Sequence, residues 1–287
     1  MKKWKTLSAI SALVVGALGA LPETEAMWLQ DEEAPEESPV DRTFPRSVLA
    51  VNGQLVPNHE SIGPNPFSVH ILCITASVES LNAGFSQELR SFTSIAFEAN
   101  AQLWKIGADA FAHFAVLHSI CIPGGVEVLE NGCFASCHSL ASVTFEPNSL
   151  LQTIGTSAFF SCSALRSICL PASVEELGEH CFEVCRSLQF FFFEGASLLH
   201  TIGAFAFTAS SLQVICLPES VQTLGAHCFD GCRALISLAF EGASQLQEVG
   251  ERAFCGSGIQ IADLPPRVRT ILESGSRPTS TGESAAP

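Results

Sequence analysis

The sequence contains no tyrosine and little positive charge. It has 21 phenylalanines but no Tyr, the aromatic that suits wet surfaces because it joins an apolar ring to a hydroxyl group. Lysine and arginine number 14 against 29 Asp and Glu, and Lys105 is the only lysine between residues 69 and 272. The phenylalanines are therefore predicted to fill a core. The lack of a basic stripe argues against nucleic acid or an anionic membrane surface as a partner.

The sequence also lacks an apolar run of the roughly 20 residues that a membrane-spanning helix needs. The run Leu7–Leu21 has 15 residues and follows the basic start MKKWK. A basic start, a short apolar stretch and small residues after it are typical of a secretory signal peptide. We predict a signal peptide over residues 1–26, cleaved after Ala20 or Ala26, and a secreted or cell-surface protein with no transmembrane span after cleavage. An uncleaved membrane anchor is the alternative.

Three further segments fall outside the repetitive part of the chain. Residues 27–47 carry five acids between Asp31 and Glu37 and are predicted to be a disordered linker. Residues 48–68 contain Asn52-Gly53 between two β-branched runs, which predicts a hairpin that caps the array. The polar residues 273–287 are predicted to be a disordered tail.

Between these segments the chain repeats itself. ICLPASVEELGEHCF at residues 168–182 returns as ICLPESVQTLGAHCF at 215–229, and units such as FEGASLLHTIGAFAF from Phe193 alternate with it. A strand pattern, LxxIxL, recurs every 23–25 residues, a length typical of leucine-rich repeats. Residues 69–272 are therefore predicted to be an α/β-type repeat solenoid: a leucine-rich repeat array with a parallel sheet of about nine short strands and little regular helix. The nine strand patterns begin at Val69, Phe92, Leu117, Leu140, Leu165, Leu188, Leu212, Leu235 and Ile259.

Each coil has a recurring set of core and turn positions. Positions one, four and six of LxxIxL are predicted to point inward, as Leu165, Ile168 and Leu170 do in the fifth strand. Proline closes many strands because a residue without an N–H suits the end of a ladder. A glycine column follows in the next turn, where a positive φ is the expected requirement; it comprises Gly107, Gly155, Gly178, Gly203, Gly225 and Gly250.

The coil LRSICLPASVEELGEHCFEVCRSL, residues 165–188, resembles the BspA-like leucine-rich repeat family, and the resemblance covers about residues 69–272. The first copy, from Val69, departs from the pattern because it lacks the strand-end proline and both later cysteines. The resemblance implies a secreted or surface-attached microbial protein that acts in adhesion, attachment to host cells or binding of extracellular matrix proteins. It carries no shared catalytic residues.

Twelve cysteines fall in columns along the array. Adjacent strands lie about 4.8 Å apart, so members of a column that recurs in every second coil are about 9.6 Å apart. That exceeds the roughly 7 Å between Cα atoms that a disulfide tolerates, and it also excludes a shared zinc ion. The exceptions are a CFxxC pair within one coil and Cys162 with Cys137 or Cys185. Most cysteines are therefore interpreted as small buried hydrophobic residues.

Other polar columns suggest no catalytic or metal site. His180 and His227 share a column but two coils separate them, and the spacing gives neither a fixed Cys or Asp partner. The column of Glu98, Glu146 and their equivalents is interpreted as a solvated rim, with steering of cationic ligands as the alternative. No cofactor, metal or catalytic residue is predicted.

Positions three and five of the strands are predicted to form a concave binding strip of small, uncharged residues. The sequence QFFFFEG interrupts it, because Phe190 and Phe192 should point outward while Phe191 and Phe193 point inward. Two exposed aromatics are typical hot-spot residues; the alternative is that they pack on a neighbouring loop or on the N-terminal segment. The candidate partner-binding residues are Ser119, Cys121, Thr144, Ser167, Cys169, Phe190, Phe192, Val214 and Cys216.

The leading hypothesis is a non-enzymatic, secreted or surface-exposed binding protein that captures a macromolecular partner, namely a host or extracellular matrix protein, on its concave sheet. No nucleic acid and no small-molecule cofactor is expected. One alternative is a secreted effector with a thiol-based activity, for which no catalytic domain is apparent beside the array. The other is a structural protein of a cell envelope.

Overall fold

The computed structural model describes residues 49–51, 54–56, 71–74, 76, 78–81 and 92–275. The predicted signal peptide, residues 1–26, and the predicted linker, residues 27–47, lie outside these residues, as does the tail from residue 276 onward. The boundaries assigned to these segments stay predictions.

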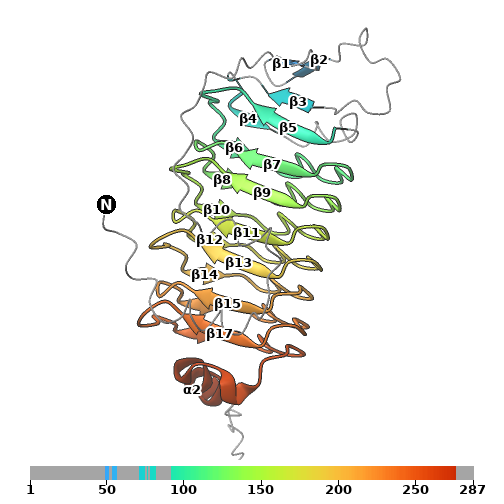
Figure 1. Cartoon of the computed structure of the whole chain (residues 1–287). Helices are drawn as coiled ribbons and strands as arrows, with labels where there is room; N and C mark the ends of the chain where they lie inside the picture. The colour runs from blue at the N-terminus through green and yellow to red at the C-terminus, as the bar shows by residue number, and fades with distance from the viewer. Residues whose placement is uncertain are drawn as a thin grey trace, which may run out of the picture. The chain divides into compact units, whose positions relative to one another are not determined.

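Eight long strands of four residues follow one another in chain order along the solenoid (Figure 1). The hydrogen-bonded pairs among them are all parallel. They confirm the predicted leucine-rich repeat solenoid with a parallel sheet and little helix. The long strands are β3 (Ile71–Ile74), β5 (Ser94–Phe97), β7 (Ser119–Ile122), β9 (Ser142–Phe145), β11 (Ser167–Leu170), β13 (Phe190–Phe193), β15 (Val214–Leu217) and β17 (Ser237–Phe240).

A hairpin extends the long-strand sheet beyond the first coil. Strand β1 (Leu49–Val51) pairs antiparallel with β2 (Gln54–Val56). The same strand β1 pairs parallel with β3, so the sheet begins in the order β2-β1-β3-β5-β7-β9.

A second parallel sheet lines the other side of the coils and is not among the sequence predictions. Its eight strands have two residues each, too few to reveal an alternating pattern. They are β4 (Ser80–Leu81), β6 (Lys105–Ile106), β8 (Val128–Leu129), β10 (Thr153–Ile154), β12 (Glu176–Leu177), β14 (Thr201–Ile202), β16 (Thr223–Leu224) and β18 (Glu248–Val249).

The core between the sheets contains a column of phenylalanine rings, one per coil. Neighbouring rings stack nearly parallel with centroids 5.1–5.6 Å apart. Positions one and four are buried as predicted, with Leu165 at 0% exposure. Position six is buried in most strands, as at Leu170, but half-buried in β5, β9 and β13. Each coil thus completes the core of its neighbour. The column consists of Phe111, Phe134, Phe159, Phe182, Phe207, Phe229 and Phe254.

The long strands associate in pairs. Pairs β3–β5, β7–β9, β11–β13 and β15–β17 align all four residues, whereas β5–β7 aligns two, and the sheet divides between β9 and β11 and between β13 and β15. Within a pair, the residue after the second strand donates its N–H to the first strand, as Glu194 does to Leu170 O at 2.9 Å. At the equivalent position after β11 stands Pro171, which has no N–H. The strand-end prolines therefore remove one ladder hydrogen bond at every second step.

The glycine column corrects the prediction of positive φ. None of its six members has a positive φ. A Cβ on Gly178 would instead lie 2.7 Å from the backbone of Gly155 and Thr156 in the preceding coil. Glycine is required because the backbones of successive coils touch there. The positive φ occurs two residues later, for example at His180 (φ 56°) and Phe205 (φ 58°).

The ninth predicted strand is wrong. Residues Ile261–Asp263 form a 3₁₀ helix, η3, and α2 (Pro266–Gly275) follows. Pro265 cannot donate to a ladder, while Pro266 suits the first position of a helix because its fixed φ is helical and its missing N–H would be unpaired anyway. Val268, at 0% exposure, buries the apolar side of α2 in the core. The helix includes the first three residues of the segment predicted to be a disordered tail.

Candidate functional site

The predicted binding residues all lie on one surface, the long-strand face, formed by the outward side chains of strands β7, β9, β11, β13, β15 and β17. Side chains alternate along a strand, so the inward residues anchor each strand and leave positions three and five free. In β7 and β11 the exposed residues alternate strictly with buried ones. Ser119, Cys121, Thr144, Ser167 and Cys169 are exposed, whereas Phe190, Val214 and Cys216 are half-buried.

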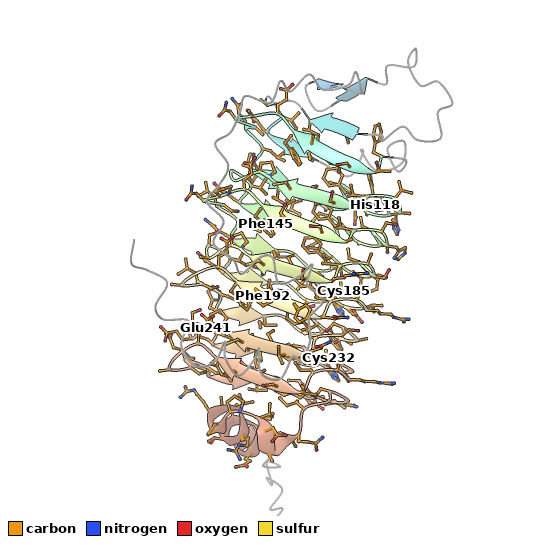
Figure 2. The ribbon with its side chains drawn as sticks, in the orientation of Figure 1. His118, Phe145, Cys185, Phe192, Cys232 and Glu241 are labelled. Atoms are coloured by element: carbon orange, nitrogen blue, oxygen red, sulfur yellow. The ribbon has the colours of Figure 1, made fainter. Side chains whose placement is uncertain are left out.

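Strand β13 interrupts this face with two aromatic rings. Phe192 is 52% exposed, and its ring stacks on that of Phe190 at 6.3 Å with an interplanar angle of 5°. Phe191 between them is 3% exposed and packs edge-on against Phe182 and Phe207 in the core. The structure therefore buries Phe191 and exposes Phe192 as the alternation predicts, whereas Phe190 and Phe193 are both half-buried. Figure 2 shows Phe192 near the middle of the long-strand face.

Cys121, Cys169 and Cys216 on this face are free thiols, and the ionisation of the last two is disfavoured. Partial burial raises the pKa of Cys216 to about 11, and the nearby carboxylate of Glu241 adds to the shift. The pKa of Cys169 is raised by the same two causes, with Glu194 as the carboxylate. A nucleophilic cysteine needs its pKa lowered. The environment of these thiols therefore opposes a thiol-based catalytic role.

Seven other cysteines have 0% exposure, which confirms their interpretation as core residues. Four of them also donate a weak hydrogen bond to the carbonyl of a phenylalanine in the preceding coil. Cys162 Sγ lies 3.2 Å from Phe134 O, and Cys232 Sγ lies 3.0 Å from Phe207 O. Ser210 occupies the same column and lies 3.3 Å from Cys232 Sγ. The column joins successive coils through a small donor side chain.

His180 and His227 have acidic partners, and the aspartate beside His227 corrects the prediction that neither has a Cys or Asp partner. His180 Nδ1 lies 2.6 Å from Glu183 Oε2, and His227 Nδ1 lies 2.8 Å from Asp230 Oδ2. Both imidazole rings stack on Phe205 between them, with centroids 4.8 Å away. The signal was present in the sequence as acids three residues after each histidine. Each pair and the shared stack fix the side chains on the coil surface.

The glutamate column is also more than a solvated rim. Glu98 Oε2 accepts a hydrogen bond from the backbone N–H of Ala76 at 3.0 Å, and Glu146 Oε2 accepts one from Gly124 at 2.9 Å. These carboxylates satisfy donors in the preceding coil just after its long strand. Their position and their bonds indicate a structural role at the edge of the face.

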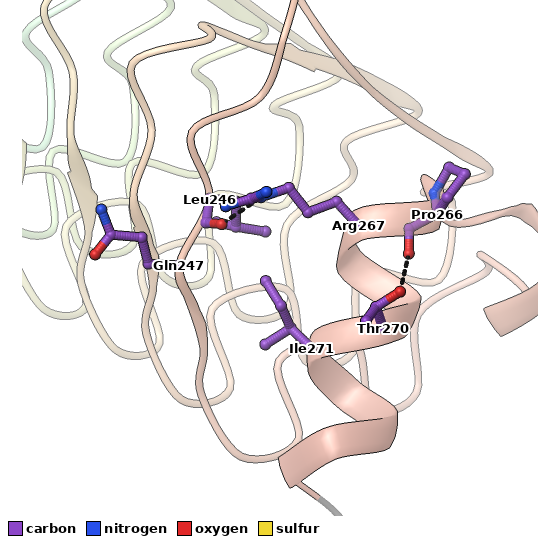
Figure 3. A pocket seen from close by; sticks show the side chains of 6 residues that line it. All are labelled: Leu246, Gln247, Pro266, Arg267, Thr270 and Ile271. Carbon is purple, nitrogen blue, oxygen red and sulfur yellow. Dashed lines mark hydrogen bonds between the residues drawn. The ribbon is translucent and has the colours of Figure 1, made fainter.

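A pocket of about 410 Å³ lies between the last coil and α2 (Figure 3). Arg267 Nε donates to Leu246 O, and Thr270 Oγ1 donates to Pro266 O at 3.0 Å. The arginine fastens the helix to the end of the solenoid, so the pocket belongs to the closing structure. No group of three metal-ligating side chains lies together within the described ranges. Of the helices in the described part, none is long and apolar enough to cross a membrane.

Parallel coils of about two dozen residues around one core define a leucine-rich repeat solenoid. The chain belongs to the family described as BspA type leucine rich repeat region, whose model matches six copies over residues 60–189 and 200–275. No curated protein matches the sequence of this chain.

Several solved structures resemble the chain. The pneumococcal vaccine antigen PcpA is 22% identical (TM-score 0.48), and the match covers 65% of this chain and 48% of PcpA, so this chain spans about half the length of that protein. A leucine-rich repeat protein of T. pallidum is 23% identical (TM-score 0.48), with 72% and 83% covered. One from Bacteroides ovatus is 21% identical (TM-score 0.44), with 64% of each chain covered.

Proposed function

We propose that this protein is a secreted or surface-exposed binding protein that holds a host or extracellular matrix protein on its long-strand face. The observation that carries the proposal is the stacked pair of half-buried Phe190 and exposed Phe192 on a face of otherwise small, uncharged side chains. Small side chains let a partner approach the sheet closely. The exposed ring of Phe192, supported by Phe190, offers apolar area that is buried on contact, which is typical of binding hot spots.

A non-enzymatic role is supported by the raised pKa values of Cys169 and Cys216, which keep these thiols protonated at neutral pH. Membership of the BspA-type family supports the same role, because repeat solenoids provide extended binding surfaces. Secretion is supported by the apolar run Leu7–Leu21 after a basic start.

The proposal is tested by measuring the binding of the full chain to a panel of purified host cell-surface and matrix proteins by surface plasmon resonance. For any protein bound, the double variant Phe190→Ser/Phe192→Ser should raise Kd by about 30-fold, the effect expected for one hot spot. Leu198→Ser is the matched control, because Leu198 is 56% exposed but lies in the loop after β13. Equal binding by the double variant and the control would remove the long-strand face from the function.

A further inference from the structure

The two ends of the long strands carry opposite charge. Glu98, Glu146, Glu194 and Glu241 follow the strands, while five exposed basic side chains precede them. In Figure 2 His118 and Glu241 lie on opposite sides of the long strands, with Phe192 between them. We call the second group the basic edge; it consists of His118, His138, Arg166, Arg186 and Arg233.

The basic edge is unusual in so acidic a protein. Between residues 106 and 251 the chain has no lysine, and its three arginines, Arg166, Arg186 and Arg233, all lie on this edge. The four residues directly before each long strand from β7 to β17 include no Asp or Glu. The nearest carboxylates, Glu183 and Asp230, stand three residues before Arg186 and Arg233 and bond to His180 and His227 instead. Among the described residues, no carboxylate forms an ion pair with any of the three guanidinium groups. Their charge is therefore available to a ligand.

The glutamates at the other end of the long strands do not cancel the positive charge of the basic edge. A strand of four residues is about 13 Å long, which exceeds the Debye length of about 8 Å at physiological ionic strength. A ligand group at the basic edge is therefore screened from the carboxylates at the other end of the strands. It senses mainly the nearby arginines, although the net charge of the whole chain is −15.

The backbone around the arginines is fixed. Gln189 N donates to Arg166 O at 2.9 Å, and Ser211 Oγ donates to Arg186 O. Arg186 N and Arg233 N donate to the carbonyls two residues before them, each at 2.8 Å. The side chains thus extend from hydrogen-bonded backbone positions before β11, β13 and β17.

We propose that the basic edge and the Phe190–Phe192 pair together bind an extended segment of the protein partner in which carboxylates alternate with apolar side chains. This inference rests on the proposed function and specifies its ligand. An extended segment that runs along the solenoid axis directs alternate side chains to opposite sides. Its carboxylates face the arginines, which form charge-assisted hydrogen bonds with them, and its apolar side chains face the aromatic pair.

The spacing of the arginines fits such a segment. Arg186 lies one coil beyond Arg166 and Arg233 two coils further, which places their backbones at about 5 and about 14 Å along the axis. Side chains on one side of an extended peptide recur every 6.8 Å or so, at about 7 and about 14 Å. Arg166 stands one residue before its strand, whereas Arg186 and Arg233 stand four residues before theirs. The long arginine side chains have to accommodate this offset of three residues as well as the difference of about 2 Å along the axis. A sulfated glycan would supply anions, but the C–H faces of its sugar rings offer Phe192 a smaller apolar contact than a leucine or phenylalanine side chain does.

The test uses the full chain and a dye-labelled peptide of about eight residues in which Glu alternates with Leu or Phe, followed by fluorescence anisotropy. Exposed ion pairs contribute about twofold each, so Arg166→Gln/Arg186→Gln/Arg233→Gln should raise Kd about tenfold. Arg186→Gln alone should raise it about twofold, and Arg252→Gln, which removes the same charge from an exposed position outside the basic edge, should leave it unchanged. The effect of the triple variant should disappear at high salt. Circular dichroism checks that each variant is folded.

Three results would overturn the inference: no binding of the Glu peptide by the wild-type chain at millimolar concentration, equal binding by the triple variant, or equal binding of a peptide with Lys in place of Glu. Arginine-dependent binding of a heparin fragment without binding of the peptide would assign the edge to a sulfated glycan instead. If Phe190→Ser/Phe192→Ser weakens capture of a whole protein and the triple variant does not, the proposed function stands while this inference fails.

Discussion

Removing one ring from the phenylalanine column tests whether the coils share a single core. Phe182 is fully buried between Phe159 and Phe207, with ring centroids 5.1 and 5.6 Å away, and meets Phe191 edge-on at 5.2 Å. Substitution of a buried phenylalanine by alanine costs about 3–5 kcal/mol, the higher value applying where the surroundings cannot collapse. Since neighbouring coils hold each ring at a fixed spacing, we expect Phe182→Ala to cost about 5 kcal/mol. Urea unfolding followed by circular dichroism measures this.

The matched control is Phe254→Ala at the end of the column. Phe254 is partly exposed and stacks on Phe229 alone, at 5.5 Å. We expect about half the loss, roughly 2 kcal/mol. A central defect should also uncouple the two halves of the array, so that unfolding of Phe182→Ala shows two transitions. Equal losses for the two variants would refute a column in which each ring depends on both neighbours.

Three further predictions follow from the coil contacts. Gly178→Ala should cost about 2 kcal/mol in urea unfolding, because its Cβ would overlap the Gly155 backbone; no loss would contradict that contact. Cys162→Ser should cost less than about 1 kcal/mol, because a hydroxyl can donate to the same carbonyl, and a loss above about 3 kcal/mol would contradict this. Burial raises the pKa of Cys137 and Cys185 to about 12, above the unfolded value of about 8.5. The two buried thiols contribute fully to the unfolding free energy below pH 8.5, and this contribution is lost as pH rises toward 12 because the unfolded chain releases their protons first. The unfolding free energy should therefore fall by about 2 kcal/mol or more between pH 8 and pH 10.5. Constant stability over this range would contradict the prediction.

Much of the fold could be predicted from the sequence because every coil buries apolar residues at the same positions of its strand. The pattern LxxIxL fixes which residues of a strand point inward, and its recurrence fixes the order of the strands. Eight of the nine predicted strands are present for this reason. The burial of residues such as Cys181 also follows, since a column inside a shared core has no access to water.

The parts that could not be predicted depend on contacts between coils rather than on the repeat itself. The glycines avoid a collision with the preceding coil, which a single coil does not reveal. The ninth repeat keeps the strand pattern at Ile259, but Pro265 and Pro266 direct the chain into a helix there. The two-residue strands are too short to show any period.

For the candidate site, the sequence predicts which strand side chains point outward, but not that the arginines gather at one edge of the long-strand face. Alternation alone predicts that Phe192 is exposed and Phe191 buried. Alternation does not apply to the arginines, because they lie before the strands, at positions that vary from coil to coil. The signal was available nevertheless, since Arg166, Arg186 and Arg233 are the only arginines of the central coils.

A repeat protein separates structural requirements from the other features of its surface. Residues that every coil needs recur in every coil, as the core phenylalanines and the inward leucines do. A residue that breaks a column without a structural reason therefore needs another explanation. Phe190 and Phe192 replace small side chains on the exposed face, and three unpaired arginines stand in an acidic chain beside them. Neither set completes the core or caps a backbone donor through its side chain in the described structure. Because both departures occur in the same few coils, one ligand in contact with both accounts for them more simply than two unrelated causes.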